Sequence, residues 1–75
     1  MEGSSFDQLV TDGTAALERG DYPTARELLS RAHEQRPNDP RTRFWLAAAQ
    51  YHLGNVAEAR RHLEAVLATN AIPVP

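Results

Sequence analysis

The residues that could do chemistry are scattered along this chain of 75 residues. His33, His52 and His62 fall in three different expected helices. No two of them have the four-residue spacing at which histidines on one helix bind zinc. Ser4 and Ser5 lack the sequence context of a nucleophilic serine. With no cysteine in the chain, thiol chemistry and thiolate metal sites are excluded. We therefore expect no enzyme activity, no cofactor, no metal ion and no small-molecule substrate.

The glycines do not form a phosphate-binding loop but mark a repeat. Gly20 and Gly54 stand 34 residues apart, and each is followed by a residue that can cap a helix, Asp21 or Asn55. The same offset relates further pairs of identical residues: Ala15 and Ala49, Ala25 and Ala59, Arg26 and Arg60, Leu29 and Leu63. A period of this length is typical of stacked helix–turn–helix units, which cannot bury their apolar faces alone.

Capping signals and apolar spacing predict four helices around these glycines. The first helix begins at Ser5, where Ser5 and Gln8 form a capping box, and ends at Gly20. The second is capped by Asp21 and ends at Pro37. The third helix begins after Asp39 and ends at Gly54, and the fourth begins at Asn55 with a second capping box and frays near Asn70.

The expected fold class is all-α, with four helices in two stacked hairpins, because no alternating β-branched run suggests a strand. We place the first repeat at residues 5–39 and the second at residues 40–70. We expect residues 1–4 and 71–75 to be disordered tails.

Charge and hydropathy exclude two classes of partner. The formal net charge is −2, and the arginines are interleaved with acidic residues, so we expect no binding to nucleic acid. No segment approaches the roughly 18 apolar residues of a membrane-spanning helix. The first residues show neither the basic nor the apolar region of a signal peptide. We therefore expect a soluble, cytoplasmic protein without membrane contact.

Two segments identify a resemblance. Gly20 to Ala25, followed by Leu29, Ala32 and Pro37-Asn38, resembles the second half of a tetratricopeptide repeat. Leu9, Gly13 and Ala16 resemble the first half of such a repeat. The next repeat follows in Leu46-Ala47, Gly54-Asn55, Ala59 and Leu63. Some positions depart from the family pattern. Near the start of the first helix of each repeat, the usual large aromatic residue is replaced by Leu9 and by Arg43, and midway along the same helices an aromatic residue is replaced by Ala16 and by Gln50. Ala71 stands where the second repeat would have its closing proline. The resemblance implies a right-handed superhelix whose first helices line a concave, non-catalytic groove for peptides or helices of other proteins.

By this resemblance, the groove is formed by positions on the first and third helices. They are Val10, Thr14, Leu17, Arg41, Phe44, Trp45, Ala48, Tyr51 and His52. Phe44, Ala48 and Tyr51 recur at helical spacing, so they share one face, and its apolar and aromatic character suits an amphipathic helix. Two alternatives remain open: the aromatic residues belong to the core, with Trp45 the least certain, or they receive a partner.

The fourth helix is expected to carry a second surface, an apolar face for assembly. Its apolar positions are Ala59, Leu63, Val66 and Leu67. Because stacked repeats normally need about three units and a capping helix, two repeats leave this face uncovered. A second copy of the chain, or further residues of a longer scaffold, would cover it. The sequence thus leaves two functions open, a module that binds a peptide or helix and a structural homodimerisation domain.

Overall fold

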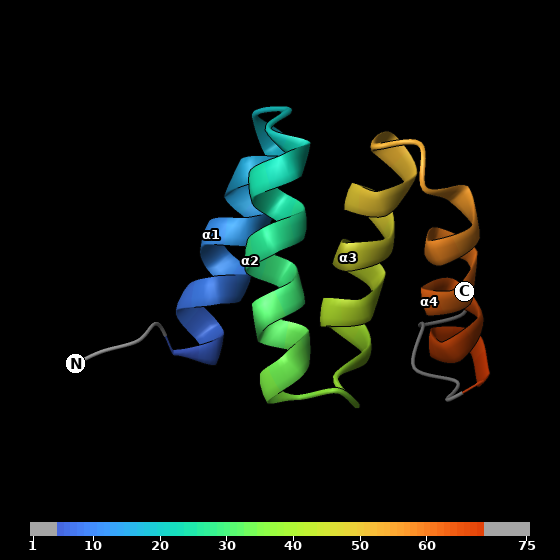
Figure 1. Cartoon of the computed structure of the whole chain (residues 1–75). Helices are drawn as coiled ribbons and strands as arrows, with labels where there is room; N and C mark the ends of the chain where they lie inside the picture. The colour runs from blue at the N-terminus through green and yellow to red at the C-terminus, as the bar shows by residue number, and fades with distance from the viewer. Residues whose placement is uncertain (1–4, 69–75) are drawn as a thin grey trace, which may run out of the picture.

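The computed structural model describes residues 5–68, and in this range the chain forms four α-helices and no strand (Figure 1). The helices are α1 (Phe6–Glu18), α2 (Tyr22–Gln35), α3 (Pro40–His52) and α4 (Val56–Ala68). The predicted all-α class with two helical hairpins is confirmed. The expected tails at residues 1–4 and 71–75, and the expected fraying near Asn70, lie outside the described residues.

The first two helices begin where a polar side chain satisfies a free backbone N–H group. The Gln8 N–H donates to Ser5 Oγ at 3.2 Å before α1, and the Thr24 N–H donates to Asp21 Oδ1 at 3.4 Å before α2. Asp39 does the same for α3. Such a cap stabilises a helix by about 1 kcal/mol. The N-terminal residues expected from the sequence therefore act as helix caps at three of the four starts.

The two predicted capping boxes are not complete. The side-chain amide of Gln8 donates to Asp12 Oδ1 at 2.9 Å, one turn further along α1, instead of reaching back to Ser5. At the second site, the side-chain amide of Asn55 donates to Gln50 Oε1 at 2.8 Å. The Asn55 N–H that Glu58 would have to accept from donates instead to the Gln50 carbonyl at 2.8 Å, and Glu58 pairs with Arg61. The reciprocal half of each predicted box is therefore wrong.

Gly20 and Gly54 end α1 and α3 in the same way. Their φ angles are 82° and 88°, in the left-handed region that glycine adopts without strain. The N–H groups of Gly20 and Asp21 donate to the carbonyls of Leu17 and Ala16 at 3.0 and 2.8 Å. This pair of bonds is a Schellman motif, and the same pair recurs around Gly54. The repeat seen in the sequence is thus a repeated turn geometry.

The helices pack in chain order as a row of antiparallel neighbours (Figure 1). α1 lies against α2, α2 against α3 and α3 against α4, while α1 also contacts α3. One core cluster joins the two hairpins with mostly small side chains: Ala16, Ala25, Leu29, Leu46 and Ala49. Small residues at these positions allow the helix backbones to approach closely.

α2 approaches α1 closely at Gly13. A Cβ atom at this position would lie 2.7 Å from Leu29 Cγ and 2.9 Å from Leu29 Cδ2. Leu29 is itself fully buried and cannot move without disturbing the core. Gly13 is therefore present because α2 occupies the space that a side chain would need.

We expect Gly13→Ala to lower the free energy of unfolding by about 1–3 kcal/mol, since it overpacks the core against Leu29. The sign of this change is informative, because replacing glycine by alanine within a helix otherwise raises the free energy of unfolding by about 0.5–1 kcal/mol. Urea denaturation measures the change. In a Leu29→Ala background the same substitution should cost little or stabilise, and an equal cost in both backgrounds would contradict the contact.

Candidate protein-binding surface

The exposed face of α3 carries three large aromatic side chains. Phe44 is 42% exposed, Trp45 38% and Tyr51 62%. The rings of Phe44 and Trp45 meet edge to face, with centroids 5.4 Å apart. Phe44, Ala48 and Tyr51 are spaced at i, i+4 and i+7, so they line one side of the helix. The alternative that Trp45 belongs to the core is not supported, because more than a third of its surface is open.

The residues expected from α1 are half-buried and contribute less surface. Val10 packs against the cluster of Phe6, Leu9 and Ala32, and Leu17 packs against the cluster that joins the hairpins. The Thr14 hydroxyl donates to the Val10 carbonyl at 2.9 Å. α1 and α3 contact each other, so these residues lie on the helix next to the aromatic face. Their part in a groove stays a prediction, while the large exposed groups belong to α3.

His52 has a structural contact that the sequence did not reveal. Its ring stacks on Tyr22 at a centroid distance of 4.4 Å and an interplanar angle of 7°. The Tyr51 ring also meets His52, at 5.8 Å and 78°. Tyr22 begins α2 and His52 ends α3, so the stack joins the two hairpins at one end. No local sequence signal links two residues this far apart, which is why Tyr22 was missed.

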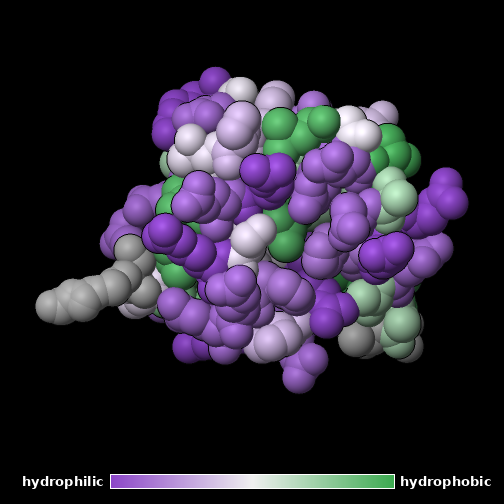
Figure 2. Space-filling view, in the orientation of Figure 1, coloured by the Kyte–Doolittle hydropathy of each residue, from purple (hydrophilic) through white to green (hydrophobic). Residues whose placement is uncertain are grey.

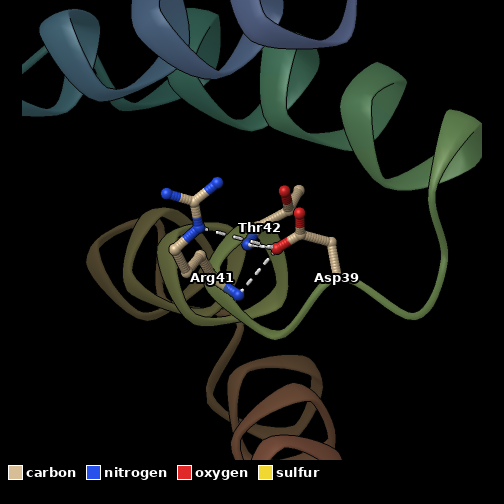
Figure 3. Close-up of polar contacts among 3 residues, drawn as sticks. All are labelled: Asp39, Arg41 and Thr42. Carbon is tan, nitrogen blue, oxygen red and sulfur yellow. Dashed lines mark hydrogen bonds and ion pairs between the residues drawn. The ribbon is translucent and has the colours of Figure 1, made fainter. Parts of the chain in front are cut away.

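Asp39, Arg41 and Thr42 form a polar cluster at the N-terminus of α3 (Figure 3). Asp39 Oδ1 accepts hydrogen bonds from the N–H groups of Arg41 and Thr42 at 2.9 and 3.3 Å. Arg41 Nε lies 4.0 Å from the same oxygen, and 75% of the Arg41 side chain is exposed. An ion pair this long and this exposed contributes little to stability. The guanidinium group therefore remains available at the surface.

The expected apolar stripe on α4 is divided by the fold. Ala59 and Val66 are each only 2% exposed, because α4 packs this side onto α3. They cannot offer surface to another chain, and their place in an assembly face is wrong. Leu63 and Leu67 remain 36% and 60% exposed. The surface left for assembly is therefore these two leucines, with Val56 exposed nearby in the sequence.

Two of the three histidines meet, contrary to the expectation that they are scattered. The rings of His33 on α2 and His62 on α4 make an edge-to-face contact at 5.4 Å and 86°. Burial lowers the pKa of both imidazoles below 6.5, and the positive charge of Arg43 lowers both pKa values further. Within residues 5–68, no group of three or more His, Asp or Glu side chains could hold a metal ion.

The view in Figure 2 shows a face that is mostly hydrophilic, with hydrophobic side chains in small separate patches. Among the residues that the structure describes, no helix is long and apolar enough to cross a membrane.

A family model described as "Tetratricopeptide repeat" matches residues 16–71. The chain belongs to the tetratricopeptide repeat family. Repeats of this family generally mediate protein–protein interactions and are generally non-catalytic scaffolds. The match covers both turns marked by Gly20 and Gly54, and it agrees with the resemblance found in the sequence. Searches of curated proteins and of solved structures gave no match.

The buried hydroxyl of Thr42, in the first turn of α3, is expected to lower the stability of the fold. It is 1% exposed, and its hydroxyl has no hydrogen-bond partner among the described residues. A buried hydroxyl without a partner costs about 1–3 kcal/mol. Thr42→Val, which keeps the shape and removes the hydroxyl, should raise the free energy of unfolding by about 1 kcal/mol in urea denaturation.

Thr42→Ser is the matched control, because it keeps the hydroxyl and removes the methyl group. It should destabilise the fold by about 1 kcal/mol. A destabilised Thr42→Val protein would show that the hydroxyl is hydrogen-bonded after all.

Proposed function

We propose that this tetratricopeptide repeat domain is a protein-interaction module that binds a peptide or amphipathic helix on the aromatic face of α3. Phe44 and Tyr51 are the anchors, Trp45 and Ala48 lie beside them, and α1 forms the adjoining wall. The exposure of these large aromatic side chains on α3 is the observation that carries the proposal. In a chain this small, leaving them in water forgoes burial that would stabilise the core.

The contact energies are adequate for reversible binding. Burying one large apolar side chain against a partner is worth about 1.5–3 kcal/mol, and a few such anchors dominate most interfaces. A micromolar complex needs about 8 kcal/mol in total. Phe44 and Tyr51 are 42% and 62% exposed, so the two anchors supply part of this and the contacts around them must supply the rest. Arg41, whose side chain is 75% exposed, adds a site for a carboxylate of the partner.

The aromatic face is tested with peptides selected from a phage-displayed random library against the whole chain. Isothermal titration should give a dissociation constant about 100-fold weaker for the Phe44→Ala/Tyr51→Ala variant, because both anchors are lost. Circular dichroism should show the same helical content, since neither side chain belongs to a buried core cluster.

Leu67→Ala is the matched control, because Leu67 is 60% exposed on α4 and Tyr51 is 62% exposed on α3. This variant should bind the selected peptides as the wild type does. A library without any enriched sequence would contradict the proposal. So would peptides that bind the double variant at wild-type affinity, or that lose affinity only on Leu67→Ala.

The second candidate is homodimerisation through α4, which the exposure of Leu63 and Leu67 favours. A second copy of the chain would cover both leucines, and the aromatic face of α3 would remain free. The two candidates differ in which helix carries the binding energy, so they are separable by substitutions on one helix at a time.

If α4 is an assembly face, sedimentation velocity should show a dimer that forms as concentration rises. Leu67→Arg should reduce it to a monomer, because a buried unpaired charge is costly. Tyr51→Arg places the same charge at an equally exposed site on α3 and should leave the dimer intact. A monomer mass at every concentration of the wild type would exclude this candidate.

A further inference from the structure

The contact between His33 and His62 spans two helices that are otherwise apart. The backbones of α2 and α4 make no close approach, whereas each packs directly on α3. The imidazole rings nonetheless meet edge to face with centroids 5.4 Å apart. Side chains therefore supply the contact between the first hairpin and the last helix, and both of these are groups that gain a charge near neutral pH.

The surroundings of the ring pair disfavour positive charge. Arg43 on α3 acts on both rings and Arg61 on α4 acts on His62. Protonating both rings would therefore bring four cations from three helices together. Two acids oppose this, Glu34 next to His33 on α2 and Glu58 on α4. Glu58 is already paired with Arg61 at 3.5 Å.

Hydrogen bonding points the same way. Nδ1 of His33 is buried and has no hydrogen-bond partner among the described residues. A neutral imidazole can keep this nitrogen unprotonated, but an imidazolium carries a proton on both nitrogens. The charged ring would then bury an N–H group with nothing to accept from it, which costs free energy. The folded contact thus accommodates the neutral ring better than the charged ring.

We propose that the His33–His62 pair is a proton-operated joint that holds α4 against the first hairpin at neutral pH and releases it in mild acid. Loss of this contact leaves the first hairpin intact, because its core residues do not include either ring. Neither ring belongs to a buried cluster, and α4 still packs on α3. Loosening is therefore expected on the side of α4 that faces α2. The joint is separate from the aromatic face and does not depend on the proposed function.

The direction of the pH effect follows from the lowered pKa values. Burial is the largest cause that lowers the pKa of His33 and of His62 below 6.5, and Arg43 lowers both pKa values further. The folded chain therefore binds fewer protons than the unfolded chain. The stabilising contribution is complete above pH 6.5 and is lost as the pH falls from there through the lower folded pKa values.

Thermal unfolding of the whole chain at about pH 7.5 and about pH 5.5 tests the joint. The wild type should lose roughly 5 °C in Tm at the lower pH. The His33→Gln/His62→Gln variant should lose much less, because neither side chain can gain a charge. His52→Gln removes a histidine that lies outside the pair, and it should keep the wild-type loss. An equal loss in the double variant would overturn the proposal.

Wild-type protein alone provides a second test, which holds even if the double variant does not fold. In an NMR titration the ring protons of His33 and His62 should report pKa values below 6.5. Amide exchange, corrected for its intrinsic pH dependence, should accelerate in α4 more than in α1 as both rings protonate. Ring pKa values at or above 6.5, or equal acceleration in the two helices, would refute the joint.

Discussion

The close approach of helices across small residues is the constraint on which the rest of the structure depends. Gly13 leaves room for Leu29, and Ala16, Ala25 and Ala49 allow the two hairpins to share one core with it. With the backbones this close, a chain of 75 residues can bury enough apolar surface without a disulfide. The aromatic residues of α3 lie outside these shared contacts and stay partly exposed at the surface.

Polar groups fix where the helices begin and end, and this determines which residues reach each end of the stack. The left-handed glycines close α1 and α3 with the same hydrogen bonds, while Asp39 caps α3 beside the exposed Arg41. The aromatic face therefore runs from the exposed Arg41 at the start of α3 to the stacked His52 and Tyr22 rings at its end. The turns at Gly20 and Gly54 and the cap at Asp39 therefore determine both the fold and the ends of the candidate surface.

Local features were predictable from the sequence, and contacts between distant helices were not. Gly20 and Gly54 determine their turns because glycine adopts a positive φ without strain. The hairpins and the repeat could therefore be predicted from the positions of these glycines in the sequence. The burial of Val66 and the meeting of His33 with His62 depend on how α4 sits against α2 and α3. Helical spacing shows which residues share a face, but it does not show which part of that face a neighbour covers.

The central claim is that α3 presents the binding surface of this domain. The most direct measurement is the pattern of backbone amide shifts when a selected peptide is added to labelled protein. The account predicts that the largest changes fall on α3 from Phe44 to Tyr51, with smaller changes on the facing residues of α1. Changes concentrated on α4 around Leu63 and Leu67, with α3 unaffected, would contradict it.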